Sequence, residues 1–327
     1  MKTIHWGIIG AGDVCEVKSG PAFYKIENSA LTAIMRRNED KAKDFAQRHG
    51  VPKYYTDARE LINDPEIDAI YVATPPNSHK DYAIMAMEAG KPVYVEKPMA
   101  MNYAECKMMI DVAERTKQKL FVAFYRRALP YFEKVKSLLE EQYIGDVLTV
   151  QVTHYVRAKE SDRNPQNHTW RIDKKIAGEG YFYDLAPHTL DILDFLLGEI
   201  EEAQGYARNL GGLYDVKDTI SAIFKFKSGI LGTGQWCFVS SEHSLQDTIE
   251  IKGTKGMITF GTFDFSPIEI ESDEKNGSFN FFRPEHIQQP LIQTIIDELR
   301  GVGECPSTGV SGARTSRVMD MILGNIS

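Results

Sequence analysis

The chain has 327 residues, a length that predicts two domains, and its 43% hydrophobic and 26% charged residues are ordinary for a globular protein. Its net charge of −8 excludes a nucleic acid as the main partner, because phosphate binding needs a basic surface. No apolar run approaches the length of a membrane span, and the first residues lack the pattern of a secretory signal. The four cysteines, Cys15, Cys106, Cys237 and Cys305, lie far apart. We therefore expect a cytoplasmic protein with free thiols, no metal site and no membrane partner.

The first ~120 residues alternate short apolar runs with amphipathic stretches, which is typical of βαβ units. The predicted strands are Thr3–Ile9, Leu31–Met35, Ala69–Ala73, Pro92–Val95 and Leu120–Ala123. The predicted helices between them are Asp40–His49, Lys80–Ala89 and Tyr103–Lys117. Several strands are apolar at every position, as strands buried on both faces are. This order predicts a parallel, doubly wound sheet.

After about Tyr125 the pattern changes to strands with little helix between them, which predicts a mostly antiparallel sheet. The predicted strands are Val147–Val156, Glu201–Leu210, Asp218–Phe226, Ile230–Phe238, Gln246–Lys252 and Met257–Phe260. The predicted helices are Leu129–Glu140, Ile287–Arg300 and Gly309–Leu323. We therefore predict an α/β protein with a Rossmann domain over residues 1–123 and an α+β domain over residues 124–327.

A glycine-rich turn closes the first predicted strand, in the sequence from Gly7 to Cys15. Gly10 permits a sharp turn, and Gly12 leaves room for a pyrophosphate beside the backbone N–H groups of Asp13 and Val14 at a helix start. The same spacing also occurs in ordinary glycine turns. Its position after the first buried strand of a βαβ series favours a dinucleotide site.

The end of the second predicted strand bears on the choice of cofactor. An acidic residue there favours NAD, because it accepts hydrogen bonds from the ribose 2′-hydroxyl. This sequence instead has Arg36 and Arg37, whose guanidinium groups suit a 2′-phosphate. The pair therefore favours NADP, with NAD as the alternative, unless it is only a solvated basic turn.

Several motifs occur together in an order that identifies a family. They are Gly10–Ala11–Gly12, the run Ala73–His79, the tripeptide Glu96–Lys97–Pro98 and the run Gly178–His188. With these motifs the chain resembles, over nearly its full length, the Gfo/Idh/MocA family of oxidoreductases. The resemblance implies a Rossmann domain joined to an α+β domain built on a large open sheet, which often makes the contact of a homodimer or homotetramer. Three positions depart from the family pattern, namely Cys15, Glu179 and Pro187.

The chemistry of such an enzyme needs an acid–base group and a positive charge near the reacting oxygen. The resemblance assigns the acid–base role to His188, and Asp184 lies four residues earlier, on the same face of a helix. Pro187 predicts that this helix begins near Asp184, because a proline is tolerated only in the first turn of a helix. Asp184 would then lie at or close to the N-cap. Lys97, at the end of a buried strand, is expected to orient and stabilise the reacting oxygen. Whether Lys97 or His188 accepts the proton stays open, and we favour His188.

Further candidates for cofactor contacts lie at the same sheet edge and before the catalytic helix. The resemblance places the loop with Thr74, Pro75, Asn77 and His79 along the nicotinamide ribose and pyrophosphate. Arg127 follows the last Rossmann strand, and Glu96 adjoins Lys97. Trp170 offers an apolar face and Arg171 a hydrogen-bonding fork. Each of these side chains could instead make an ordinary structural contact.

The sequence thus predicts a dehydrogenase or reductase that transfers a hydride between a nicotinamide cofactor, with NADP favoured, and a sugar, cyclitol or related polyol. Two alternatives remain. One is a glycosidase that uses NAD as an internal redox catalyst, and the other is an inactive, dinucleotide-sensing regulator. Retention of Lys97, Asp184 and His188 argues against the regulator.

Overall fold

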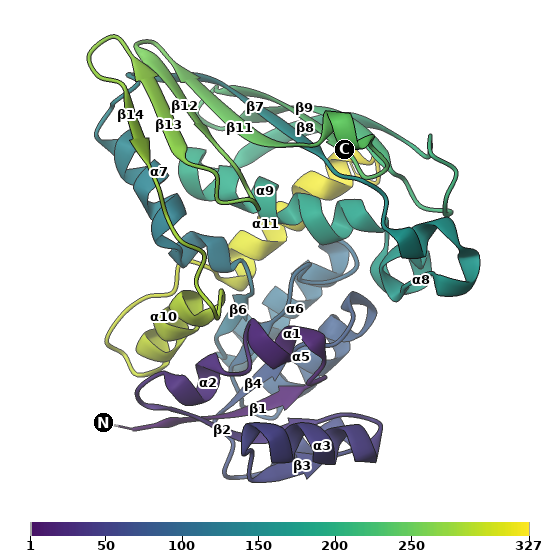
Figure 1. Ribbon diagram of the computed structural model, residues 1–327. Helices are drawn as coiled ribbons and strands as arrows, with labels where there is room; N and C mark the ends of the chain where they lie inside the picture. The colour runs from purple at the N-terminus through teal and green to yellow at the C-terminus, as the bar shows by residue number, and fades with distance from the viewer. Residues whose placement is uncertain (1, 327) are drawn as a thin grey trace. The chain divides into compact units, whose positions relative to one another are not determined.

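The computed structural model describes residues 2–326 and divides into two compact units (Figure 1). Among the described residues, unit 1 comprises 2–128 and 284–313, and unit 2 comprises 129–283 and 314–326. The first crossing, after Ala128, lies close to the predicted boundary. The return of residues 284–313 to unit 1 differs from the two continuous domains predicted from the sequence. This segment returns because residues 307 and 308 pair with β6.

Unit 1 is built on a six-stranded parallel sheet with the order β3-β2-β1-β4-β5-β6. Its strands are β1 (Ile4–Ile9), β2 (Ser29–Met35), β3 (Lys53–Tyr55), β4 (Ala69–Val72), β5 (Val93–Val95) and β6 (Leu120–Val122). Its longer helices are α3 (Glu39–His49), α4 (Ala58–Asn63), α5 (His79–Glu88), α6 (Tyr103–Thr116) and α10 (Gln289–Leu299). Two short helices, α1 (Asp13–Val17) and α2 (Ala22–Lys25), follow β1. The predicted parallel, doubly wound sheet is confirmed.

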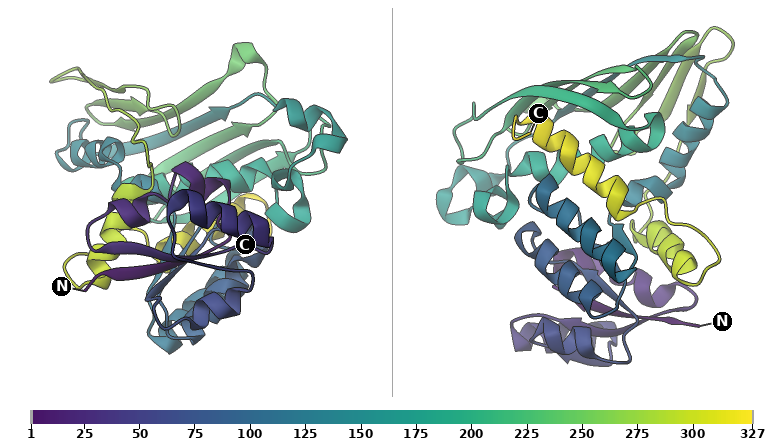
Figure 2. Two further views of the ribbon diagram at one scale, coloured as in Figure 1. Left: turned by 60° about the horizontal axis from the view of Figure 1, so that its bottom comes forward. Right: turned by 180° about the vertical axis from the view of Figure 1, so that it is seen from behind.

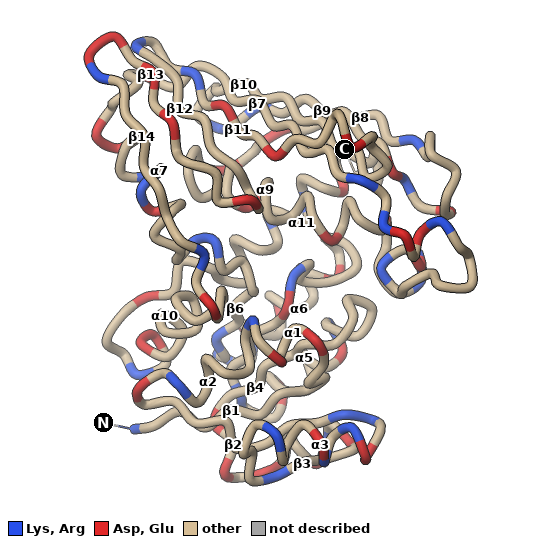
Figure 3. Tube along the Cα trace, in the orientation of Figure 1, with Lys and Arg blue, Asp and Glu red and all other residues tan. Residues whose placement is uncertain are grey.

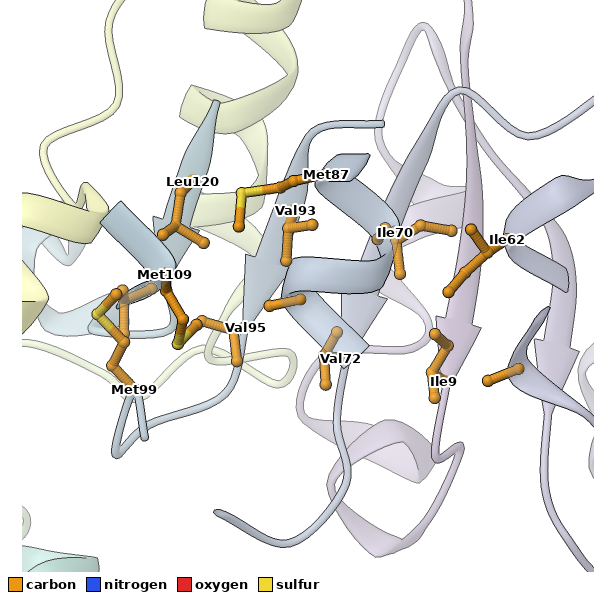
Figure 4. Packing of buried hydrophobic residues seen from close by; sticks show 14 of the residues in the cluster. Ile9, Ile62, Ile70, Val72, Met87, Val93, Val95, Met99, Met109 and Leu120 are labelled. Carbon is orange, nitrogen blue, oxygen red and sulfur yellow. The ribbon is translucent and has the colours of Figure 1, made fainter. Parts of the chain in front are cut away.

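One face of this sheet packs on α4, α5 and α6 through aliphatic side chains and methionines (Figure 4). Val72 from β4, Val95 from β5 and Met109 from α6 all belong to this buried cluster. Gly7 of β1 lies on this face, and a Cβ atom there would approach Leu61 of α4 to 2.7 Å. The glycine therefore lets α4 lie close against the centre of the sheet.

The opposite face carries a row of aromatic rings. Trp6 of β1 packs on Phe23 of α2 with ring centroids 4.9 Å apart, and Phe23 packs on Tyr71 of β4 at 5.2 Å. Tyr71 in turn stacks on Tyr94 of β5 at 4.8 Å. The two tyrosines place hydroxyl groups inside this otherwise apolar layer, and such groups need hydrogen-bond partners.

Residues 284–313 complete unit 1 from the far end of the chain, as the yellow-green α10 beside β6 shows (Figure 1). Ser307 Oγ donates to the carbonyl of Val122, and Thr308 forms an antiparallel bridge with Phe121. This segment therefore covers the otherwise open edge of β6.

Unit 2 is built on an eight-stranded sheet with the order β14-β13-β12-β11-β7-β10-β9-β8, in which only the β7–β10 pair is parallel. Its central strands are β7 (Val147–Tyr155), β8 (Ile200–Arg208), β9 (Thr219–Phe226), β10 (Leu231–Cys237) and β11 (Gln246–Gly253). The remaining strands are β12 (Gly256–Phe260), β13 (Ile268–Ser272) and β14 (Gly277–Phe279). Buried residues alternate with exposed or partly exposed ones along β9 and β10, so one face is covered and the other is open. The predicted mostly antiparallel sheet is confirmed.

Helices α7 (Pro130–Glu140), α9 (Tyr181–Leu197) and α11 (Gly309–Ile322) accompany this sheet (Figure 2). Phe182 of α9 meets Trp236 of β10 edge to face at 5.6 Å, and Gly205 of β8 leaves room for Ile322 of α11. Arg314 of α11 holds Asp194 of α9 through two hydrogen bonds of 2.7 Å. A bidentate pair of this kind fixes the two helices along a defined direction.

Several elements differ from the sequence prediction, among them helix α4, which was not predicted. Strands β3, β13 and β14 were not predicted, and each is short, at three to five residues. Helix α9 begins at Tyr181, so the predicted start near Asp184 is wrong, and the N-cap is Gly180 with φ 62°. Pro187 therefore lies inside the helix. Since most of α9 around Pro187 is buried, we infer that tertiary packing offsets the backbone hydrogen bond that the proline cannot donate.

Within residues 2–326, no helix has both the length and the apolar character needed to cross a bilayer. Positive and negative side chains are interspersed along the chain in Figure 3.

Candidate functional site

The glycine-rich turn after β1 has the backbone geometry that was predicted for it. Gly10 has φ 86°, and its N–H donates to the carbonyl of Met35 on β2 at 3.0 Å. A Cβ atom on Gly10 would lie 2.6 Å from Thr74 Cγ2 and 2.9 Å from Thr74 N. Both the positive φ and the close approach of the loop after β4 therefore require glycine at this position.

At Gly12, neither the backbone conformation nor a neighbouring atom of the protein requires glycine. It is the N-cap of α1, with φ −104°, and a Cβ atom there would meet nothing closer than Gly10 O at 3.7 Å. The space above Gly12 is therefore open, next to the first N–H groups of α1 at Asp13 and Val14. This arrangement fits a dinucleotide pyrophosphate, which needs close access to the backbone.

Cys15 stands where the family pattern has a third glycine, and it fits the same turn. Its side chain is fully buried, and burial raises the pKa of its thiol to about 12. Gly20 lies directly against Cys15, since a Cβ atom there would fall within 2.1 Å of the Cys15 carbonyl oxygen. The close packing usually provided by the third glycine is thus provided at a second position, Gly20.

Two basic side chains follow β2 at the same sheet edge. Arg36 is half-buried, and its N–H donates to the carbonyl of Tyr55 on β3, whereas Arg37 is exposed. Asn38 then caps α3 by accepting a hydrogen bond from the N–H of Lys41. No carboxylate occupies positions 36–38, and Glu39 and Asp40 follow in the first turn of α3.

The loop after β4 is braced by a buried histidine. Thr74 and Pro75 are half-buried and Asn77 is exposed, whereas His79 is fully buried at the start of α5. Its Nε2 lies 2.6 Å from the Thr74 carbonyl and its Nδ1 lies 2.9 Å from the Pro98 carbonyl. Burial lowers the pKa of His79, and the two carbonyl oxygens oppose this shift. His79 thus ties the loop after β4 to the segment after β5, and both of its nitrogens contact the protein itself.

The tripeptide Glu96–Lys97–Pro98 follows β5. Lys97 is half-buried, and a cis peptide joins it to Pro98. The carboxylate of Glu96 turns inward and accepts hydrogen bonds from Tyr71 and Gln288, each at 2.6 Å. Glu96 was predicted to contact the cofactor; its buried carboxylate instead accepts hydrogen bonds from side chains and backbone of unit 1.

Arg127 lies in the turn after β6 and is buried, with Nη1 donating to the carbonyl of Pro306 at 3.2 Å. The structure of unit 1 therefore gathers the predicted cofactor residues from the ends of β1, β2, β4, β5 and β6. In open parallel sheets, ligands bind at this carboxyl edge.

Unit 2 brings together the candidates that precede and begin α9. Arg171 Nε lies 3.3 Å from Asp184 Oδ2, and its guanidinium lies over the ring of Trp170, 4.7 Å from the centroid. Asp184 and Arg171 are both partly exposed, whereas His188, one helical turn further along, is buried. The guanidinium of Arg171 therefore orients the carboxylate of Asp184. Arg171 has this structural contact whether or not it also binds a ligand.

A histidine that sequence reasoning missed lies close to His188. His154 of β7 is buried, and the rings of His154 and His188 both pack on Phe263, with centroids 4.7 Å and 5.7 Å from it. Directly opposite His154 in the sheet register is Asp247 of β11, with Oδ1 3.4 Å from His154 Nδ1. Burial acts to raise the pKa of Asp247, but the nearby His154 and the backbone N–H groups of Thr262 and Phe263 lower it overall. The sequence did carry a signal for His154, because alternate residues of β7 point to the same face of the sheet and His154 shares the buried face with Val150 and Val152.

Among residues 2–326, no three histidine, cysteine or carboxylate side chains are grouped as a metal ion requires. None of the four cysteines, which all lie within the described residues, is part of a disulfide.

Comparison with known proteins identifies the family. Residues 4–124 match the oxidoreductase family with an NAD-binding Rossmann fold, and residues 132–259 match the GFO/IDH/MocA C-terminal domain. The chain belongs to the Gfo/Idh/MocA family. The predicted family is thereby confirmed, as is the prediction that the chain is a nicotinamide-dependent dehydrogenase.

Individual relatives cover most of the chain. It is 39% identical over 323 residues to "Oxidoreductase P35" of Formosa agariphila, covering 98% of each sequence. It is 30% identical to the levoglucosan dehydrogenase of Pseudarthrobacter phenanthrenivorans, over 80% of this chain and 74% of the relative. A solved levoglucosan dehydrogenase in complex with NADH and levoglucosan has the same fold, with a TM-score of 0.85 at 23% identity, covering 98% of this chain and 96% of that one.

The contrast between Gly10 and Gly12 gives a test of the cofactor site. We expect Gly12→Ala to fold normally, because its Cβ meets nothing closer than 3.7 Å, and to weaken NADPH and NADH binding about tenfold or more by filling the cofactor's space. Fluorescence titration with both dinucleotides and thermal unfolding would measure this. Gly10→Ala is the matched control, and we expect it to lose about 1–3 kcal/mol of stability through strain. Unchanged dinucleotide binding in Gly12→Ala contradicts the assignment of this turn.

Proposed function

We propose that this protein transfers a hydride between a nicotinamide cofactor and a CH–OH group of a sugar, cyclitol or related polyol. The observation that carries the proposal is the gathering of the phosphate-binding turn, the two arginines and Lys97 at one edge of the six-stranded sheet. Membership of the family and the similarity to levoglucosan dehydrogenase support the same substrate class. In unit 2, Asp184 and His188 supply the acid–base chemistry that oxidation of a carbinol needs.

The mechanism assigns each of these residues one task. When bound, the nicotinamide supplies the acceptor for the hydride that leaves the carbinol carbon. His188 accepts the hydroxyl proton, because an imidazole is the side chain whose ordinary pKa lies near neutral pH. Lys97 donates a hydrogen bond to the same oxygen and stabilises the negative charge that develops on it. Asp184 is held in place by its ion pair with Arg171, and it supplies a negative charge one helical turn before His188.

The catalytic assignment is tested with His188→Ala and Lys97→Met. Screening sugars, inositols and deoxysugars with both cofactors first identifies a substrate of the wild type. We then expect each variant to lower kcat by about 10²–10⁴, because each removes a group that acts on the reacting oxygen. The control is His243→Ala, which changes an exposed histidine on unit 2. Full kcat in both variants, or substrate turnover with no net change in nicotinamide, contradicts the proposal.

We further propose that NADP is the preferred cofactor. The support is the pair Arg36 and Arg37 after β2, with no carboxylate at positions 36–38 to accept hydrogen bonds from a ribose 2′-hydroxyl. Two guanidinium groups can clamp a 2′-phosphate, and they gain nothing comparable from a hydroxyl. The solved levoglucosan dehydrogenase holds NADH, so the arginines carry this proposal alone.

Replacing both arginines tests the cofactor preference. We expect Arg36→Gln combined with Arg37→Gln to weaken NADPH binding by about 100-fold or more, since each of the two lost charge-assisted hydrogen bonds contributes about 1.5–3 kcal/mol. NADH binding should stay unchanged, because NADH lacks the phosphate. Fluorescence titration measures both, with Arg59→Gln, an exposed arginine on α4, as the control. Wild-type protein that binds NADH as tightly as NADPH overturns the preference.

The open face of the eight-stranded sheet supports a homodimer or homotetramer. Large apolar side chains on its central strands are exposed, namely Leu148 of β7, Tyr206 of β8, Ile223 of β9 and Leu231 of β10. Exposed apolar side chains gathered on one face of a sheet are a feature of protein–protein contacts. A second copy of the same sheet is the simplest cover, since a twofold contact uses one patch on both subunits.

The assembly is tested by light scattering coupled to size-exclusion chromatography. We expect the wild type to elute as a dimer or tetramer and Ile223→Asp to shift it toward the monomer, because a carboxylate in that contact must be desolvated. Phe282→Asp is the control, since Phe282 is exposed but lies outside the sheet strands. A monomeric wild type at micromolar concentration rules the assembly out.

A cytoplasmic location is also proposed, on the evidence of the thiols. Cys15, Cys106 and Cys305 are buried outside any disulfide, and burial raises the pKa of Cys305 to about 11. Thiols of this kind are typical of a reducing compartment, where no disulfide is needed to hold the fold.

A further inference from the structure

A buried carboxylate lies immediately beside Lys97 on the chain. Glu96 is only 8% exposed, yet each of its oxygens has a donor. Oε1 accepts from the Tyr71 hydroxyl and from Gln288 Nε2, each at 2.6 Å, and Oε2 accepts from the backbone N–H of Lys97 at 3.2 Å. The peptide that carries Lys97 is therefore attached to a carboxylate whose direction is set from inside unit 1.

The direction of Gln288 is itself fixed. Its side chain is 1% exposed, and its Oε1 accepts a hydrogen bond from the Tyr94 hydroxyl at 2.8 Å. Because a hydroxyl donates to the amide oxygen, the amide nitrogen must face Glu96. The backbone N–H of Gln288 also donates to the carbonyl of Lys18, just beyond α1. Gln288 therefore cannot turn away from Glu96 without breaking contacts at both of its ends.

The same network reaches the helix of the phosphate-binding turn. The Tyr71 hydroxyl lies 3.2 Å from Ser19 Oγ, and Ser19 Oγ donates to the carbonyl of Val14 in α1. Burial and the nearby Glu96 carboxylate raise the pKa of both Tyr71 and Tyr94, so both hydroxyls stay protonated as donors. Buried hydrogen bonds thus join the end of β5 and the start of α10 to Tyr71 of β4 and, through the backbone N–H of Gln288, to Lys18 just beyond α1. The polar contact of Tyr71 with Ser19 lies beside them.

We propose that Gln288 is a positioning residue for Lys97. It acts through Glu96: its amide holds the carboxylate in the orientation that accepts the Lys97 N–H, and so fixes the direction in which the lysine leaves the sheet edge. The inference rests on the proposed role of Lys97 toward the reacting oxygen. A buried carboxylate that loses a hydrogen-bond donor has a higher free energy until it finds another one. Removing the Gln288 amide therefore allows the Glu96 side chain and the Lys97 peptide to reorient.

Gln288→Met tests this role because it keeps the size of the side chain and removes its hydrogen bonds. We expect kcat to fall about tenfold or more, as displaced catalytic groups produce, while KM and NADPH affinity change little. Tyr94→Phe removes a single oxygen and allows the Gln288 amide to flip. It should therefore lower kcat by a smaller factor than Gln288→Met does, again with little change in KM and NADPH affinity. The control is Gln293→Met on the same helix, where the amide bonds only Asp297 on the partly exposed side.

A readout that needs no substrate separates this inference from the proposed function. Reductive methylation with isotopically labelled formaldehyde gives each lysine an NMR signal, and Lys97→Arg identifies that of Lys97. We expect the Lys97 signal to shift in Gln288→Met and in Tyr94→Phe and to stay in place in Gln293→Met. A Lys97 signal that does not move, or an unchanged kcat, overturns the positioning role. Failure of the wild type to oxidise any polyol, with the Lys97 signal still shifting, overturns the proposed function instead.

Discussion

Burial of the six-stranded sheet on both faces is the constraint on which the rest of unit 1 depends. Strands such as β4 and β5 are buried at every position, so neither face can carry a solvated polar group. Groups that must meet a ligand are therefore confined to the strand ends. The parallel arrangement then brings the ends of β1, β2, β4, β5 and β6 to one edge, although up to about a hundred residues separate them in the sequence.

The same burial explains why Glu96, Tyr71 and Tyr94 form a network. A hydroxyl or carboxylate between two layers of side chains cannot turn to water, so its partners must be provided by the protein. Phe23 and Trp6 fill the aromatic layer around them, and the polar atoms pair with one another and with Gln288. Polar groups of this kind fix one arrangement of the strand ends, where an apolar layer would allow several.

Sequence reasoning was most successful where a pattern is local. The apolar runs predicted five of the six strands of the parallel sheet, and the glycine turn and Lys97 were placed at strand ends. It failed where the deciding contact is distant. Gln288 meets Glu96 across 192 residues, and nothing near either residue marks the pairing. His154 and Asp247 were missed for the same reason, because their register depends on the pairing of β7 with β11. Strand β3 was missed because three residues are too few to show a period.

Helix α9 shows how tertiary packing overrides a local rule. Pro187 argues for a helix that begins beside it, yet the helix extends six residues further toward the N-terminus. Gly178 and Gly180, with positive φ, turn the chain into the helix earlier, and Tyr181, Phe182 and Tyr183 are all buried. Burial of three aromatic rings contributes several kcal/mol, more than the lost hydrogen bond costs.

The division of unit 1 between two distant segments has a consequence for synthesis on the ribosome. A nascent chain of about 130 residues contains every strand of the parallel sheet but lacks the segment that covers β6 and the glutamine that meets Glu96. Until residues 284–313 emerge, the edge of β6 and a buried carboxylate await their partners, although N-terminal domains usually fold first. The dinucleotide-binding half is thus the first to be translated and among the last to be completed.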